Sequence, residues 1–67
     1  MISLTINGEH RRFETPLTAG QLVANLELAG RRVALERNGE IVPRGQFDQQ
    51  QLSDGDFIEI VVAVGGG

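Results

Sequence analysis

The chain has 67 residues, a formal net charge of −3 and no cysteine. A domain of this size buries only about 60% of its unfolded surface, so its margin of stability is small, and without cysteines its core must come from ordinary packing of aliphatic side chains. The missing cysteines exclude disulfides and thiolate metal sites, and the single histidine, His10, cannot form a zinc site alone. An acidic chain without tryptophan or tyrosine also lacks the features of a nucleic-acid-binding surface.

No apolar run approaches the roughly 20 residues that a membrane-spanning helix needs. The N-terminal residues lack the basic segment followed by an apolar stretch that is typical of a secretory signal. We therefore expect a cytoplasmic protein with neither membrane nor nucleic acid among its partners. The two local basic pairs, Arg11-Arg12 and Arg31-Arg32, are interpreted as solvated surface.

The N-terminal segment predicts a β-hairpin. Residues 2–6 alternate between aliphatic and polar side chains, which is the period of a strand. Asn7-Gly8 follows, the strongest short-range hairpin signal, and residues 9–14 are polar except for Phe13. A two-residue loop would pair Ile2 with Phe13 on one face, whereas a three-residue loop would turn Phe13 outward. Because Phe13 has the character of a core residue, we favour the two-residue loop.

Thr18 marks the start of the predicted helix. Its hydroxyl suits the N-cap position, and Gln21 completes a capping-box pattern. One apolar stripe along this helix contains Ala19, Leu22, Val23, Leu26 and Ala29, with Leu28 off the stripe. Gly30 is the expected residue just beyond the helix, and Arg31 and Arg32 would then lie at its negative end.

The second half predicts a further hairpin and a final strand. A strand at 33–35 leads to an Asn38-Gly39 turn and a short return strand at 41–42. A polar segment, 44–51, has Phe47 and Leu52 as expected anchors, and a tight turn at 54–56 precedes the last strand. In that strand Ile58, Ile60 and Val62 share one face, while Phe57, Glu59, Val61 and Ala63 share the other.

This order of elements predicts an α+β fold of the β-grasp type. We expect a mixed sheet of four to five strands with one main helix packed on one face. The first strand should lie centrally and parallel to the last one, with the helical segment as the crossover. Residues 1–64 would form the domain, and residues 65–67 a flexible Gly-Gly-Gly tail.

A self-contained catalytic site is not evident in the sequence. There is no cysteine nucleophile, and Ser3 and Ser53 lack the context of an activated serine. The acidic residues are dispersed, and no phosphate-binding loop motif occurs. We therefore expect no enzyme, no intrinsic catalytic residue, no bound cofactor and no metal.

The remaining reactive group is the terminal carboxylate of Gly67. A carboxylate is a poor electrophile and needs activation, for which adenylation with ATP by a partner enzyme is the usual route. Because glycine has no Cβ, Gly65 and Gly66 could thread a passage too narrow for other residues. Three extended glycines reach roughly 10 Å beyond the fold. The alternative is an ordinary chain end, where small residues accumulate without function.

With these features the chain resembles the ThiS family, the ubiquitin-like sulfur carriers of thiamin thiazole synthesis. The resemblance rests on the β-grasp pattern, the segment Asn-Gly-Glu-Ile-Val-Pro-Arg at 38–44, the Asp-Gly-Asp turn at 54–56 and the terminal Gly66-Gly67. It covers essentially the whole chain. The central segment is its specific part, because a terminal Gly-Gly occurs in all ubiquitin-like carriers.

The resemblance implies a mechanism and partners. An E1-like adenylyltransferase (ThiF type) would use ATP to convert the Gly67 carboxylate to an acyl-adenylate. Sulfur relayed from a cysteine desulfurase would then give a thiocarboxylate on Gly67. A thiazole synthase (ThiG type) would receive this sulfur, with Gly65 and Gly66 threading the active site of the partner.

Partner recognition needs a surface near the tail. We predict that Val61 and Ala63, with Phe57, form part of it on the sheet face away from the helix, because an open apolar sheet face is often a docking site. The alternative is that loops or a second layer cover this face.

Other functions remain open at this stage. The related small subunit of molybdopterin synthase (MoaD) shares the implied fold and chemistry, although such chains are commonly longer. Carriers for tRNA thiolation, a ubiquitin-like protein modifier that forms isopeptide bonds from Gly67, and an inert β-grasp interaction module are further alternatives.

Overall fold

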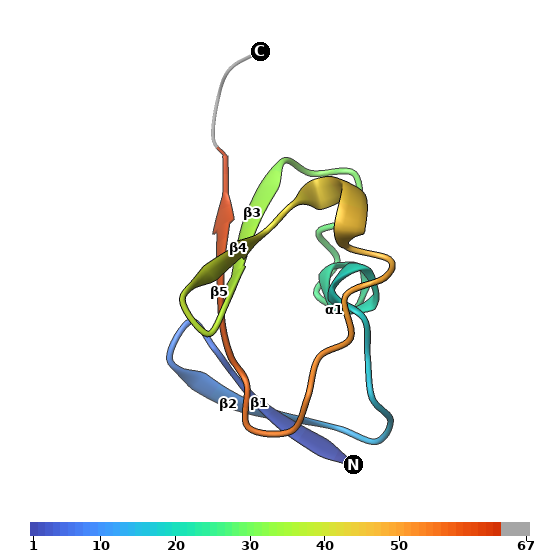
Figure 1. Cartoon of the computed structure of the whole chain (residues 1–67), viewed down its shortest axis with the longest axis vertical. Coiled ribbons are helices and arrows are strands. Elements are labelled where there is room, and N and C mark those ends of the chain that lie inside the picture. The colour runs from blue at the N-terminus through green and yellow to red at the C-terminus, as the bar shows by residue number, and fades with distance from the viewer. Residues whose placement is uncertain (64–67) are drawn as a thin grey trace.

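A computed structural model describes residues 1–63 as a five-stranded sheet with one α-helix (Figure 1). The elements are β1 (Ile2–Ile6), β2 (Glu9–Phe13), α1 (Ala19–Asn25), β3 (Val33–Arg37), β4 (Glu40–Val42), the 3₁₀ turn η1 (Arg44–Gln46) and β5 (Phe57–Val62). The strand order is β2-β1-β5-β3-β4. β1 and β5 are parallel and the other neighbours are antiparallel, so the sheet is mixed. The predicted β-grasp topology, with the first strand beside the last, is confirmed.

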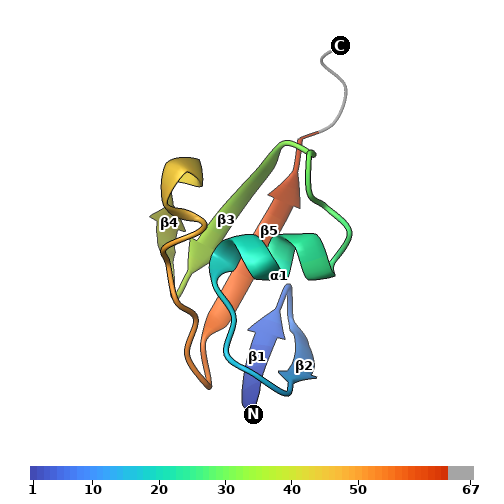
Figure 2. The ribbon, with the colours of Figure 1, turned by 90° about the vertical axis from the view of Figure 1, so that its right-hand side faces the viewer.

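The helix α1 lies across one face of the sheet (Figure 2). Alternate residues of the strands and one stripe of α1 fill the space between the two layers, as their periodicity requires. The buried core consists of Ile2, Leu4, Ile6, Ala19, Leu22, Val23, Leu35, Val42, Phe47, Leu52, Ile58 and Ile60. The expected anchors of the polar segment, Phe47 and Leu52, are both among them. Within residues 1–63 no helix is long and apolar enough to cross a membrane.

The first hairpin has the predicted two-residue loop. Ile2 pairs with Phe13 and Ile6 with Glu9. Asn7 and Gly8 both have positive φ, 50° and 84°, which matches the twist of the flanking strands. Phe13 therefore faces the helix and packs against the core.

The predicted end of the helix is wrong. α1 ends at Asn25 rather than near Ala29, and Glu27, with φ 62°, is the left-handed residue just beyond the helix. Gly30 also has positive φ, 83°, but it lies in the turn that follows Leu28. The Glu27 amide donates to the Ala24 carbonyl and the Leu28 amide to the Val23 carbonyl, at 3.0 and 2.9 Å. These two bonds define a Schellman motif. It turns Leu28 onto the core, and this burial explains why the helix stops before its apolar stripe is exhausted.

Replacing Glu27 by glycine is expected to stabilise the fold by about 0.5–1 kcal/mol, because a non-glycine residue in the left-handed region is strained. Chemical denaturation of both proteins measures the difference in free energy of unfolding. Glu14→Gly, in an exposed segment after β2 with no positive φ, is the control and should not stabilise. An unchanged or lower stability for Glu27→Gly would contradict the assigned helix end.

The two turn asparagines also hold β5, a role that the sequence pattern did not indicate. The side-chain Nδ2 of Asn7 donates to the Ile60 carbonyl at 3.0 Å, and the side-chain Oδ1 of Asn7 accepts from the Ile60 backbone amide at 2.8 Å. From the other side, the Asn38 oxygen accepts from the Phe57 amide at 2.9 Å. Both hairpin turns therefore clamp the strand that leads to the C-terminal glycines.

Candidate functional site

The described part of the candidate site is the end of β5 and the sheet face around it. Gly67, predicted to be activated, and Gly65 and Gly66, predicted to thread the active site of the partner, lie outside the described residues, which end at Ala63. The Ala63 amide donates to the Arg32 carbonyl at 2.9 Å. This bond continues the β3–β5 pairing one residue beyond the strand and fixes the point from which the final residues start.

The two faces of β5 differ as predicted. Ile58 and Ile60 are 1% and 7% exposed beneath the helix, whereas Phe57 and Val61 are each 63% exposed on the opposite face. Ala63 is exposed as well. Within residues 1–63, the chain's own loops leave these side chains open. The alternative in which loops cover this face does not hold for the described residues.

Two glutamates lie at the centre of the open face. Glu59 of β5 is directly opposite Glu36 of β3. This pair lies two residues along the strands from the Val61–Ala34 pair, on the same face. Ile41 of β4, 71% exposed, is opposite Glu36 on its other side. Like charges placed directly opposite destabilise an isolated sheet, by roughly 0.2–1 kcal/mol. Exposed apolar groups around an unfavourable charge pair indicate a surface arranged for something other than stability.

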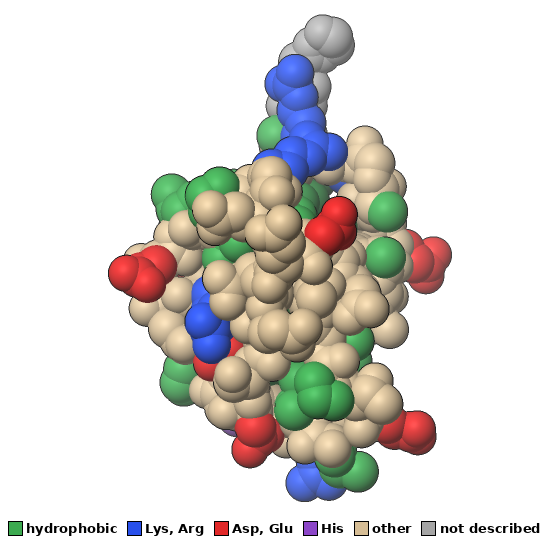
Figure 3. Space-filling model, turned by 45° about the vertical axis from the view of Figure 1, so that its right-hand side comes forward, with side chains coloured by type: hydrophobic (Ala, Val, Ile, Leu, Met, Phe, Trp, Pro, Cys, Tyr) green, Lys and Arg blue, Asp and Glu red, His purple; other side chains and the backbone are tan. Residues whose placement is uncertain are grey.

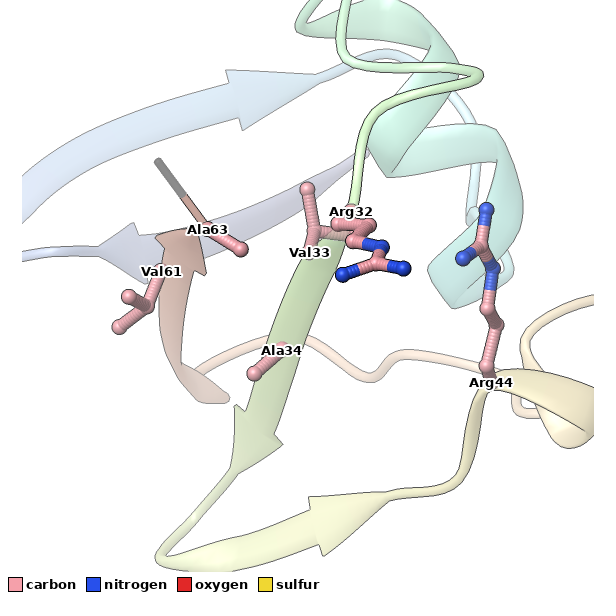
Figure 4. Close-up of a pocket in the computed structure, with 6 residues that line it drawn as sticks. All are labelled: Arg32, Val33, Ala34, Arg44, Val61 and Ala63. Carbon is pink, nitrogen blue, oxygen red and sulfur yellow. The ribbon is translucent and has the colours of Figure 1, made fainter. Parts of the chain in front are cut away.

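A pocket of about 320 Å³ lies where β3 and β5 reach the tail end of the sheet (Figure 4). It is lined by Arg32, Val33, Ala34, Arg44, Val61 and Ala63. Since α1 ends at Asn25, the predicted placement of Arg31 and Arg32 beside the helix terminus is wrong, and Arg32 instead directly precedes β3. Arg44 was missed as a site residue, because the segment 38–44 was interpreted only as a mark of the family and nothing local places Arg44 beside Arg32.

Asp56 is the one buried charged residue among residues 1–63, at 6% exposed. Its carboxylate accepts from Arg37 Nε at 2.7 Å, Asn38 Nδ2 at 3.0 Å and the Ser53 amide at 2.8 Å. Burial alone raises the pKa of Asp56, but these hydrogen bonds and the Arg37 charge outweigh it, so the pKa lies below its ordinary value. The network joins the second hairpin turn to the start of β5.

The other titratable side chains of residues 1–63 do not gather into a metal-binding cluster. His10 is exposed on β2. Within residues 1–63, no three His, Cys, Asp or Glu side chains are placed to hold a metal ion. The structure brings Val61 and Ala63 together at the pocket at the end of β5. Phe57 lies on the same face but at the opposite end of the strand, where it lines a separate pocket.

The ThiS family model matches residues 4–67, nearly the whole chain. The chain belongs to the ThiS family. A sulfur carrier protein ThiS from Bacillus subtilis is 37% identical over 65 residues, which cover 96% of this chain and 98% of that protein. The crystal structure of the thiamine biosynthesis protein ThiS from Geobacter metallireducens superposes with a TM-score of 0.83 at 33% identity, covering 98% and 100% of the two chains. The predicted ThiS family and ubiquitin-like β-grasp fold are confirmed.

A thiazole synthase from Paramagnetospirillum magneticum is also similar to this ThiS-family chain. The two are 46% identical over 66 residues, which cover 98% of this chain but 20% of that protein. This chain therefore spans about a fifth of the length of that relative.

Proposed function

We propose that this chain carries sulfur for the thiazole moiety of thiamin as a thiocarboxylate on Gly67. It is a sulfur carrier protein of thiamine biosynthesis, and it acts as a co-substrate of its partner enzymes. The strongest support is the match with the Bacillus subtilis sulfur carrier over nearly the full length of both chains. The sequence after β5 contains Gly65, Gly66 and Gly67, which have no side chains.

The chemistry begins at the Gly67 carboxylate. A carboxylate oxygen attacks the α-phosphorus of ATP on the adenylyltransferase, and pyrophosphate leaves. The terminal sulfur of a desulfurase persulfide attacks the resulting acyl-adenylate, and AMP leaves. A thiol then cleaves the sulfur–sulfur bond, which releases the thiocarboxylate and leaves a disulfide on the donor side. The carrier contributes its carbonyl carbon and no catalytic side chain.

Three partners follow from this chemistry. The family resemblance supplies an E1-like adenylyltransferase of the ThiF type, which uses the ATP, and a cysteine desulfurase as the sulfur source. A thiazole synthase of the ThiG type is the acceptor. Thiazole synthases of Paramagnetospirillum magneticum and Magnetococcus marinus each contain a segment similar to 98% of this chain, at 46% and 36% identity. The presence of a segment similar to this chain within a synthase polypeptide supports direct binding between this chain and a thiazole synthase.

The open face of β5 docks the adenylyltransferase. Phe57 and Val61 are exposed apolar side chains, and Ala63 is the last described residue before the reactive tail. A partner that covers these groups removes them from water and places the tail in its active site in the same step. The contact is modest in area, as suits a carrier that has to dissociate.

Val61→Glu is expected to raise the Kd for the adenylyltransferase about tenfold or more, because a buried unpaired carboxylate is costly at an interface. Isothermal titration calorimetry measures it. His10→Glu adds the same charge on exposed β2 and is the control. Wild-type affinity for a folded Val61→Glu protein would exclude this face.

The sulfur-carrying step is tested by intact mass spectrometry. The chain ending at Gly67 is incubated with ATP, the adenylyltransferase of the same organism and sodium sulfide. The expected product is heavier by one sulfur-for-oxygen exchange, and a chain lacking Gly67 gains nothing. Covalent adducts to other proteins would instead indicate a protein modifier, and an unchanged mass with an active enzyme would indicate an inert interaction module.

A further inference from the structure

The pocket at the end of β5 brings two arginines together from separate parts of the chain. Arg32 lies just before β3, and Arg44 opens the 3₁₀ turn η1 after β4. Both line the same 320 Å³ pocket, and Figure 4 shows their guanidinium groups extending into the space beside the start of β3. Positive side chains also gather at this end of the molecule in the space-filling view (Figure 3).

Neither arginine side chain forms an ion pair or a hydrogen bond within residues 1–63. Within residues 1–63, the one ion pair is Arg37–Asp56, and the side chains of Arg32 and Arg44 make no hydrogen bond there. The chain carries a net charge of −3, so a converging pair of guanidinium groups runs against its overall charge. Two like charges on one pocket are unfavourable until an anion enters between them.

The rest of the pocket is apolar. Its other lining residues are Val33, Ala34, Val61 and Ala63. Once a partner covers such a surface, water is excluded and an arginine–carboxylate contact strengthens, because the local dielectric falls. Guanidinium groups also bind carboxylates through two parallel hydrogen bonds, which fixes orientation.

We propose that this pocket receives an acidic side chain of the adenylyltransferase, carried on an apolar segment, between Arg32 and Arg44. The proposal rests on the proposed function and deepens it by naming the chemistry of the contact. Charge complementarity selects a carboxylate. The pocket shares Val61 and Ala63 with the predicted docking face, so the ionic contact and the apolar contact belong to one interface.

The position of the pocket indicates that this contact would orient the tail. Ala63 lines the pocket, and its amide donates a hydrogen bond to the Arg32 carbonyl. A carboxylate held in the pocket would therefore lie beside Ala63, the last residue before the tail. Only Val64 and the three glycines separate Ala63 from the reacting carboxylate. A bidentate contact at this point sets the direction in which a short tail enters the active site, and small errors in placement are costly in rate.

The test compares charge reversals on the full chain ending at Gly67. The Kd for the organism's own adenylyltransferase is measured by calorimetry at several salt concentrations. Arg32→Glu/Arg44→Glu is expected to weaken binding about a hundredfold and to flatten the salt dependence, and each single alanine variant should weaken it about tenfold. Arg11→Glu/Arg12→Glu on exposed β2 makes the same change in net charge and is the control. Thermal unfolding of each variant verifies that it is folded.

The outcomes separate this proposal from the one it rests on. If the wild-type chain neither binds nor becomes adenylated, the proposed function fails and this contact with it. If the wild-type chain binds and the Arg32/Arg44 variants bind equally well, only the pocket assignment is overturned. An equal loss in the Arg11/Arg12 variant also overturns it, because attraction would then follow net charge. If affinity is unchanged but NMR signals of residues 65–67 shift in the isolated variants, the occupant is the chain's own tail and the partner assignment is wrong.

Discussion

Replacing Gly66 by valine is expected to lower the rate of thiocarboxylate formation about a hundredfold while leaving the folded domain unchanged. The reason is steric. Valine carries a branched Cβ and strongly prefers a few backbone conformations, whereas glycine adds no side chain to the width of the passage. If Gly65 and Gly66 thread a narrow active site, the added methyl groups displace the Gly67 carbonyl from the attacking nucleophile.

The rate is measured by intact mass spectrometry at saturating carrier, so that weaker docking is separated from misplacement of the tail. Gly66→Ala should fall between wild type and Gly66→Val. Gly45→Ala is the matched control, because a Cβ at Gly45 meets nothing within 4 Å and its φ is not positive. Equal rates for wild type and Gly66→Val would mean that the tail passes through no constriction.

Asp56→Ala is expected to destabilise the fold by about 3 kcal/mol, because it leaves a half-buried arginine and two amide donors without their acceptor. Arg37 Nε, Asn38 Nδ2 and the Ser53 amide all donate to this carboxylate. A domain of this length has a total stability of roughly 3–10 kcal/mol, so the loss is a large share of it. Urea denaturation measures the difference, and Asp48→Asn, on an exposed carboxylate, is the control.

Acidification should remove the same contribution. Because the pKa of Asp56 is lower in the folded than in the unfolded chain, the carboxylate stabilises the fold at every pH above its unfolded pKa of about 4. That contribution is lost as the pH falls from there through the folded pKa. The stabilities of wild type and Asp56→Asn should therefore differ at pH 7 and converge in acid. A constant difference across this range would show that the charge of Asp56 contributes nothing.

The hairpins show how far local pattern carries a prediction. Asn7-Gly8, after the alternating segment 2–6 and before the apolar Phe13, was sufficient to set the register that pairs Ile2 with Phe13, because a turn of two residues with positive φ leaves no other pairing. The capping box of Thr18 and Gln21 was equally local, and the structure contains both of its hydrogen bonds. The two faces of β5 followed from the period of a strand alone.

The helix end shows where local pattern stops. By conformational preference, glycine at position 30 was the better residue to follow the helix. The helix nevertheless ends at Asn25, and Glu27 takes a left-handed backbone conformation that is strained for a residue with a Cβ. The deciding term is the burial of Leu28 against the core, a contact that spacing within the helix could not reveal. The same holds for Asp56, which looked like an ordinary turn residue until Arg37 and Asn38 were placed beside it.

The sequence by itself determined the order of the elements, the register of the first hairpin and the exposed face of β5, because each depends on residues within a few positions of one another. Only the tertiary structure decided which distant residues meet. Arg32 and Arg44 are separated by a full hairpin, and they converge on one pocket because β4 returns antiparallel beside β3. Such pairings arise from strand order and sheet register, which couple residues far apart in the chain, and no local pattern records that coupling.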